Sequence, residues 1–198
     1  MKIEYLGHAC FKIISADGEL VIDPYKDGSV DGLQPLRVTA DKVICTHQHD
    51  DHSGVECVTL SGNECNIRIW PISSWHDDQH GKLRGPNTMF VLESEGFRLA
   101  HIGDLGCPLD DMQQKLLRNM DVLMIPVGGY FTIDAKQAAE IVKQVKPKCV
   151  IPMHYRGENF GYKVLAPVDD FLALVDGYER TEKTISVGEK SGVLVPSF

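Results

Sequence analysis

In the stretch Thr46-His47-Gln48-His49-Asp50-Asp51-His52, four common metal-ligand side chains lie within six residues, directly after the apolar run Val43-Ile44-Cys45. The apolar run predicts a buried strand. Because side chains alternate in direction along an extended segment, His47, His49 and Asp51 can point toward one side of the strand end, and the last histidine follows on the turn. Imidazole nitrogen and carboxylate oxygen are ligands that zinc and similar cations take. The stretch therefore predicts a metal site.

Three further metal-ligand side chains each follow another apolar run. His76 follows residues 69–72, Asp104 follows residues 99–103, and His154 follows residues 150–153. Ligands that recur at strand ends are what a site on one edge of a sheet requires. We therefore expect all seven side chains to meet in one place.

Two other histidines lie near these positions. His80 lies in the polar loop 77–81, whereas His76 follows its strand directly, so we favour His76 as the ligand. His101 lies three residues before Asp104 within a strand, and alternation sends it to the opposite face. We expect His101 to be a structural histidine.

Six short blocks resemble those of a known family in sequence and order. They are Leu6–Cys10, Val21–Pro24, the His47–His52 motif, Ile102–Asp104, Ile125–Gly129 and Ile151–Tyr155. With these blocks the chain resembles the metallo-β-lactamase superfamily and, within it, the small bacterial metal-dependent hydrolases related to ascorbate-6-phosphate lactonase. The resemblance runs from near residue 3 to near residue 175. Because the segment between the motif and His76 is short, the helix that usually follows the motif must be small here.

This resemblance implies an α/β fold, a four-layer αββα sandwich with its metal site at one edge between the two sheets. We expect residues 1–198 to form a single domain of this kind. By resemblance, the first metal takes His47, His49 and His76, and the second takes Asp51, His52 and His154, while Asp104 bridges the two. The expected cofactors are two divalent metal ions, with zinc favoured and Mn²⁺ or Fe²⁺ as alternatives.

Four other residues are candidates around the metals. By resemblance, Asp23 orients a ligand histidine from behind. His8 lies in a glycine-bearing loop and Tyr155 and Arg156 directly follow the last ligand, so we list these three as candidate substrate contacts. An arginine suits a carboxylate or phosphate on the substrate. The alternatives are a partly buried histidine and a surface Tyr-Arg pair.

The remaining pattern predicts strands first and alternating helices and strands later, which is typical of a mixed α/β domain. The expected strands are 3–5, 10–14, 20–22, 43–46, 67–72, 88–93, 97–102, 121–127, 149–153, 185–187 and 193–195. Asp17-Gly18 is expected to form a hairpin turn. The expected helices are 110–120, 134–144 and 168–175. Met112, Leu116 and Met120 would share a buried face of the first helix, and Thr132 would cap the second.

Composition limits the classes of partner. The net charge of −8 argues against a nucleic-acid surface, and no apolar run approaches the ~20 residues of a membrane helix. The N-terminal residues 1–5 enter a strand directly and lack a signal-peptide pattern, so we expect a cytoplasmic protein with free thiols at its six cysteines. The expected partner is a small-molecule substrate, with neither nucleic acid nor membrane, and the sequence leaves a homo-oligomer open.

Together these features predict an enzyme that hydrolyses a small-molecule ester or lactone, with phosphorylated metabolites among the candidates. A hydroxide held between the metals would attack, and Asp51 and Asp104 are the candidate catalytic residues. No Gly-x-Ser-x-Gly nucleophile motif is present. The alternatives are a phosphodiesterase on the same centre and a non-catalytic metal-binding or sensor protein. A redox di-iron site would prefer a carboxylate at the position of His49.

Overall fold

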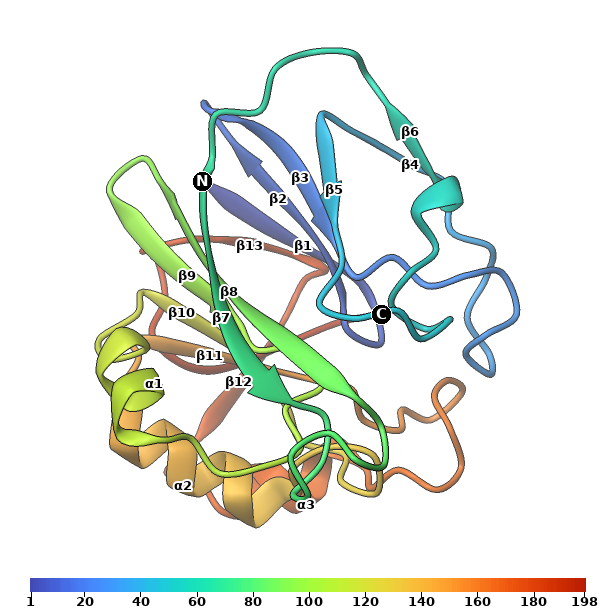
Figure 1. The fold of residues 1–198 in the computed structure, drawn as a ribbon. Coiled ribbons are helices and arrows are strands. Elements are labelled where there is room, and N and C mark those ends of the chain that lie inside the picture. The colour runs from blue at the N-terminus through green and yellow to red at the C-terminus, as the bar shows by residue number, and fades with distance from the viewer.

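The computed structural model describes residues 1–198 and contains two large β-sheets that share a hydrophobic core (Figure 1). The N-terminal sheet has five strands in the order β13-β1-β2-β3-β5. The C-terminal sheet has seven, in the order β12-β14-β11-β10-β9-β8-β7. The chain therefore completes most of one sheet before it starts the other.

In the five-stranded sheet, all pairs are antiparallel except β3 with β5. Its strands are β1 (Lys2–Gly7), β2 (Cys10–Ser15), β3 (Gly18–Ile22), β5 (Lys42–Ile44) and β13 (Thr184–Ser186). The hairpin between β2 and β3 turns at residues 16–17, one position earlier than predicted, because Ser15 pairs with Gly18.

The seven-stranded sheet is mixed, since β7, β8 and β9 form antiparallel pairs and the remaining pairs are parallel. Its strands are β7 (Arg68–Trp75), β8 (Pro86–Ser94), β9 (Phe97–His101), β10 (Val122–Pro126), β11 (Cys149–Met153), β12 (Tyr178–Thr181) and β14 (Gly192–Pro196). β11 has the predicted bounds, and β12 was not predicted. Between β8 and β9 the turn residues Glu95 and Gly96 both have positive φ, which a tight two-residue hairpin requires.

The core between the sheets follows from strand alternation. Tyr5 and Phe11 point inward from the first sheet, and Leu99 and Met124 point inward from the second. Neighbouring residues on the same strands face the other way; for example, Leu123 packs against the helices. Since the side-chain period of a strand is two, the sequence pattern alone assigns each face.

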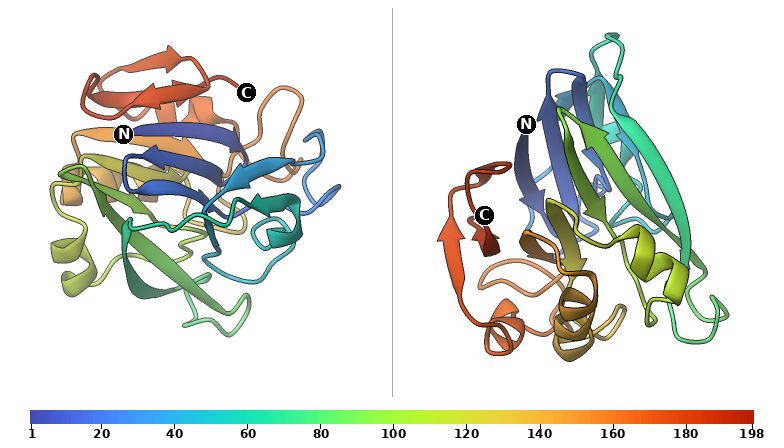
Figure 2. Two further views of the ribbon diagram at one scale, coloured as in Figure 1. Left: turned by 90° about the horizontal axis from the view of Figure 1, so that it is seen from above. Right: turned by 90° about the vertical axis from the view of Figure 1, so that its left-hand side faces the viewer.

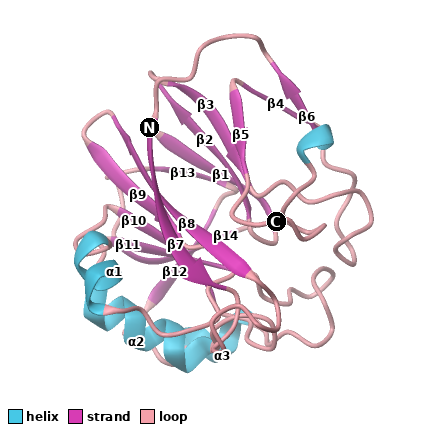
Figure 3. Cartoon of the chain, in the orientation of Figure 1, coloured by secondary structure: helices cyan, strands magenta, loops and turns pink.

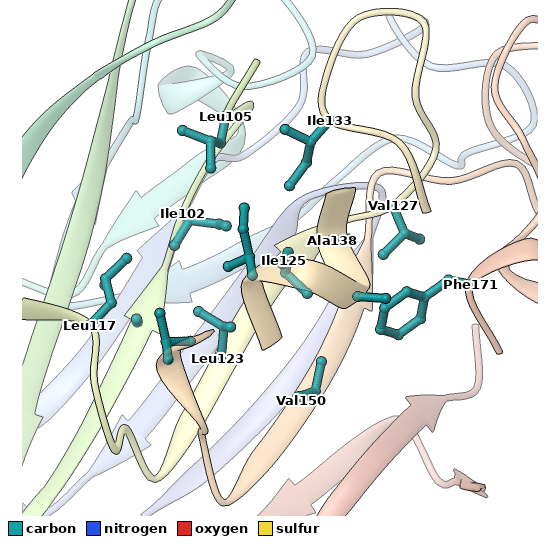
Figure 4. Close-up of a cluster of buried hydrophobic side chains, with 14 of the residues drawn as sticks. Ile102, Leu105, Leu117, Leu123, Ile125, Val127, Ile133, Ala138, Val150 and Phe171 are labelled. Carbon is teal, nitrogen blue, oxygen red and sulfur yellow. The ribbon is translucent and has the colours of Figure 1, made fainter. Parts of the chain in front are cut away.

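Three helices cover the outer face of the seven-stranded sheet, on the side away from β1–β3 (Figure 2). They are α1 (Asp111–Leu116), α2 (Ala135–Val145) and α3 (Val168–Leu172). Ala138 of α2 and Phe171 of α3 pack with sheet residues such as Ile125 in this layer (Figure 4). None of the helices is both long and apolar enough to cross a membrane.

Two details of the predicted helices were wrong. Helix α1 is only six residues long and buries none of its residues, so Met112 and Leu116 are exposed rather than buried, and Met120 is buried beyond its end. Helix α2 is capped by Asp134, not Thr132: the Asp134 carboxylate accepts from Gln137 N, and Gln137 Oε1 accepts from Asp134 N. Asp134 is two residues closer to the helix, where an N-cap must lie.

The layer outside the five-stranded sheet contains no α-helix. It consists of loops, a 3₁₀ helix η1 (Val55–Cys57) and a small parallel sheet of β4 (Val38–Ala40) with β6 (Val58–Leu60) (Figure 3). Leu6, Val21 and Tyr25 are among the side chains buried beneath it. The αββα sandwich thus has its two sheets and one full helix layer, and the other layer is reduced, as the short segment after the His47–His52 motif predicted.

Candidate metal centre

The predicted ligands lie just beyond the ends of four strands. The motif loop follows β5 of the five-stranded sheet. His76 directly follows β7, Asp104 follows β9, and His154 directly follows β11, all in the seven-stranded sheet. The candidate site therefore draws on both sheets and lies at the edge where these strand ends meet, as predicted.

Asp104 lies at the centre of the cluster. One carboxylate oxygen, Oδ2, is 3.2 Å from His76 Nε2 and 3.1 Å from His154 Nε2, and the other, Oδ1, is 3.2 Å from His52 Nε2. His47 Nε2 is 3.9 Å from Oδ2. Asp104 is only 1% exposed, so its carboxylate is surrounded by these histidines rather than by solvent. A carboxylate in contact with histidines from both predicted halves is suited to bridging two cations.

The ligands form two groups, each with its ligand atoms within 4.8 Å of one another, and a third group, His47 with His52 and Asp104, joins them. His47, His49 and His76 form the first group. Asp51, His52 and His154 form the second, together with a fourth residue, His8. The division agrees with the split implied by the family resemblance, and His8 is an addition to it.

Several buried nitrogen and oxygen atoms in the cluster have no hydrogen-bond partner. They are Nδ1 of His8, His76 and His154, Nε2 of His47, His52 and His154, and Oδ1 of Asp104. An unpaired buried polar atom is costly, and such atoms are rare in proteins unless a water or an ion satisfies them. The Nε2 atoms and Asp104 Oδ1 carry lone pairs that a divalent cation can bind. Since these atoms also face one another, the residues fit metal ions.

Asp23 orients two of the histidines. Its carboxylate is fully buried and accepts hydrogen bonds from Thr46 N at 2.6 Å, Thr46 Oγ1 at 2.7 Å and His52 Nδ1 at 2.8 Å. The bond to Asp23 keeps a proton on Nδ1, so Nε2 is the nitrogen that His52 can offer to a metal. The structure therefore places Asp23 where the resemblance predicted it.

The same network reaches His47 through Thr46. Because the Thr46 hydroxyl donates to Asp23, its oxygen is free to accept from His47 Nδ1, which is 3.0 Å away. His47 then presents an unprotonated Nε2. Thr46 had no signal in the sequence beyond its position before the motif.

Asn87 fixes the loop that carries Asp104. Its side-chain oxygen accepts from Asp104 N at 3.0 Å, and its amide donates to Ile102 O at 3.0 Å. A Cβ at Gly103, which has φ of +54°, would lie 2.4 Å from the Asn87 oxygen. Only glycine combines that backbone conformation with that closeness.

Burial and charge set the protonation of the cluster. Burial lowers the pKa of His47 to about 3, helped by neighbouring His52. Burial also disfavours the charged form of His154, but Asp104 outweighs it and raises its pKa to about 9. For Asp51, burial is outweighed by His52, His154 and His8, so its pKa is lowered and the carboxylate is ionised. The cluster thus combines anionic carboxylates with neutral imidazole such as that of His47, the donors that a divalent cation takes.

Three residues of the site have left-handed backbones, although none is glycine. They are His8 with φ of +56°, Asp23 with +51° and His154 with +51°. Such conformations are uncommon for these side chains and concentrate at functional sites.

The two competing histidines lie as expected. His80 is exposed and outside the cluster. His101 is fully buried, contacts Ala9 O through Nε2 at 2.9 Å, and accepts from Gly103 N through Nδ1 at 3.2 Å. Both ring nitrogens of His101 are satisfied, so it is structural.

The structure does not bring Tyr155 and Arg156 to the ligands. Tyr155 is 4% exposed and belongs to the core beneath the helices. Arg156 lines a groove of about 630 Å³ that contains none of the seven ligands, and its Nε donates to Leu165 O. The predicted substrate contacts of these two residues are therefore not supported, because the chain turns away after His154.

Tyr162, which sequence reasoning missed, lies closer to the cluster. Its ring packs edge-on against His8 at 5.6 Å and against Phe131 at 5.8 Å, and its hydroxyl donates to Ser29 O. Burial raises its pKa, with further contributions from Asp51 and Asp104. Nothing in its local sequence marks it, since the loop 156–167 comes to the site only through tertiary packing.

A family model described as "Beta-lactamase superfamily domain" matches residues 2–154. The chain belongs to the metallo-β-lactamase superfamily. The matched range includes all seven predicted ligands.

Two relatives described as metal-dependent hydrolases support this family assignment. A "UPF0173 metal-dependent hydrolase" from Thermococcus onnurineus is 28% identical over 88% of this chain and 92% of its own length. One from Carboxydothermus hydrogenoformans is 30% identical over 78% of this chain and 84% of its own length. These relatives are similar to the chain over most of both lengths.

Solved structures show the same fold. A metallo-β-lactamase superfamily protein from Thermotoga maritima, named as a candidate zinc-dependent hydrolase, has a TM-score of 0.78 and 34% identity, covering 98% of this chain and 97% of its own. The metallo hydrolase Igni18 from Ignicoccus hospitalis has a TM-score of 0.63 at 20% identity, covering 87% and 88%, and supports the fold alone.

Proposed function

We propose that this protein, a metal-dependent hydrolase of the metallo-β-lactamase superfamily, uses two divalent metal ions to cleave a small-molecule ester or lactone. The observation that carries the two-metal part is Asp104, whose carboxylate contacts His76, His154 and His52 at 3.1–3.2 Å. One carboxylate between two groups of histidines is the arrangement that a pair of cations requires.

In this proposal the histidines hold the cations, and Asp23 and Asn87 hold the ligands in place. The cations, when bound, supply an activated water and stabilise negative charge on the substrate oxygen. Zinc is the favoured metal because nitrogen donors predominate in the cluster, with manganese and iron as alternatives.

The two carboxylates have different roles in the proposed reaction. Asp104 is 2% exposed at its side chain and serves as the bridge, whereas Asp51 is 12% exposed and can be reached from the open side. Asp51 can therefore accept a hydrogen bond from the attacking water and orient it. Its lowered pKa keeps the carboxylate ionised as an acceptor, but makes it a weak base for taking the proton itself.

The substrate class rests on resemblance to lactonase-like hydrolases. The Arg84 guanidinium lies 5.6 Å from the Phe131 ring centre, and Phe131 packs on Tyr162, which in turn packs on His8. A cation and two aromatic rings suit a small substrate that carries a negative group. The protein's net charge of −8 disfavours a nucleic-acid substrate.

The test combines metal content and a substrate screen. Protein purified without a tag or chelator is analysed by inductively coupled plasma mass spectrometry, then assayed on esters, lactones and phosphodiesters. We expect about two equivalents of metal per chain and turnover of an ester or lactone, and no turnover by Asp104→Asn. If only phosphodiesters were turned over, the substrate class would be phosphodiesters instead of esters or lactones. Protein that takes up no metal would contradict the proposal.

A further inference from the structure

His8 occupies a strained and closely fixed position at the turn from β1 to β2. Its φ is +56°, and its side chain is fully buried. Its carbonyl oxygen accepts from His154 N at 3.0 Å and from the Tyr5 hydroxyl at 3.2 Å. A buried, non-glycine residue in this conformation persists only when its surroundings determine it. The fold therefore holds the His8 ring in one place beside the ligand His154.

The His8 ring has one polar contact. Its Nε2 lies 3.1 Å from Asp51 Oδ2, while its Nδ1 is buried and has no partner. The ring also packs on that of His154, with centres 4.1 Å apart, and on Tyr162. Since the Asp51 carboxylate can only accept, the proton of this hydrogen bond belongs to His8 Nε2.

His8 Nε2 is the one side-chain donor within 3.5 Å of the Asp51 carboxylate. His52 Nε2 and His154 Nε2 are 3.6 Å and 3.8 Å from the same Oδ2, at distances beyond a hydrogen bond. Asp51 is also on a loop rather than a strand, so its backbone does not fix its carboxylate. Without His8, the carboxylate would lose its shortest side-chain hydrogen bond on the side of the second group of ligands.

We infer that His8 is a positioning residue for the second metal: its Nε2–H donates to Asp51 Oδ2 and holds that carboxylate toward His52 and His154. This inference rests on the two-metal centre proposed above. It replaces the earlier expectation that His8 contacts substrate. Partners of this kind affect metal affinity by about 10- to 100-fold when they are removed.

The test uses three substitutions that differ in their ability to donate. His8→Gln keeps an N–H donor on a side chain of similar reach, and His8→Leu removes the donor at similar bulk. His8→Asn is too short to reach Asp51 but tolerates the left-handed backbone well, so it remains informative if the leucine variant does not fold. Circular dichroism and thermal unfolding of each metal-free variant check the fold.

Zinc affinities are measured by competition with a chromophoric chelator, and cobalt(II) absorption reports the ligands. We expect His8→Leu and His8→Asn to lose about 10- to 100-fold in affinity for one of two equivalents, with the other unchanged, and His8→Gln to stay within a few-fold of wild type.

Wild-type affinity in His8→Leu and His8→Asn would overturn the inference. The inference would also be overturned if His8→Gln bound zinc as weakly as His8→Leu and showed an altered cobalt spectrum. His8 would then be a metal ligand itself. A wild-type protein that binds fewer than two equivalents would instead refute the two-metal centre, so the two failures are distinguishable.

Discussion

Replacing Asp23 by asparagine should weaken metal binding without changing any metal ligand. The amide has the shape of the carboxylate, and asparagine, like aspartate, tolerates the φ of +51° at this position. The backbone therefore has no reason to move. What changes is the chemistry at Oδ2, which now accepts from Thr46 Oγ1 and His52 Nδ1.

The magnitude follows from the loss of that acceptor. An amide turned to accept from Thr46 N presents its NH₂ group to His52, and two donors cannot face each other. His52 must then move its proton to Nε2 or rotate, and either change removes its lone pair from the metal. Loss of such a partner typically costs about 10- to 100-fold in affinity, which is about 1.4–2.7 kcal/mol.

The assay is chelator competition with zinc on wild type and Asp23→Asn, with Asp41→Asn as the matched control. Asp41 also accepts from a backbone amide, that of Glu19, at 2.7 Å, but it contacts no ligand. The control should bind zinc as wild type does. Wild-type zinc affinity in Asp23→Asn would show that His52 does not depend on Asp23, and the orientation argument would be wrong.

Three further predictions concern the bridge, the pH dependence and the core. Asp104→Asn should lose both metals, as measured by mass spectrometry, because an amide bridges two cations poorly; two retained equivalents would refute the bridging role. Because Asp104 raises the pKa of His154 to about 9 against the effect of burial, metal-free protein holds a proton there at pH 7 that metal must displace. Zinc affinity should therefore fall as pH falls below about 9, with proton release visible by calorimetry in buffers of different ionisation enthalpy; pH-independent affinity would contradict this. Leu99→Ala, at a fully buried position between the sheets, should lower the free energy of unfolding by about 2–5 kcal/mol in urea titrations, and a loss below about 1 kcal/mol would show that the core tolerates the cavity.

The sequence was most informative where one physical rule acts locally. β11 is a continuous apolar run buried on both faces, so its bounds were predictable from periodicity alone. The motif histidines were predictable as candidate ligands because chemistry and spacing agree in one short segment. His76, Asp104 and His154 followed because ligands at strand ends must converge.

The errors occurred where tertiary contacts decide. Met112 and Leu116 have helical spacing, yet α1 ends too early for them to share a buried stripe with Met120. Tyr155 follows a ligand in sequence but turns into the core. His8 and Asp51 are 43 positions apart, and no local pattern indicates that they touch. Proximity in sequence is a weak guide to the second layer of residues around a site.

The hydrogen bond from His154 N to His8 O also bears on how the protein matures in a cell. It joins the first β-turn of the chain to the last ligand, which is made more than a hundred residues later. A nascent chain that has left the ribosome only as far as β10 carries the motif loop but no complete cluster. Stable loading of the proposed metal centre would therefore wait until β11 has been synthesised and has added to the sheet. Metal held there would bind only the folded state and so oppose its unfolding.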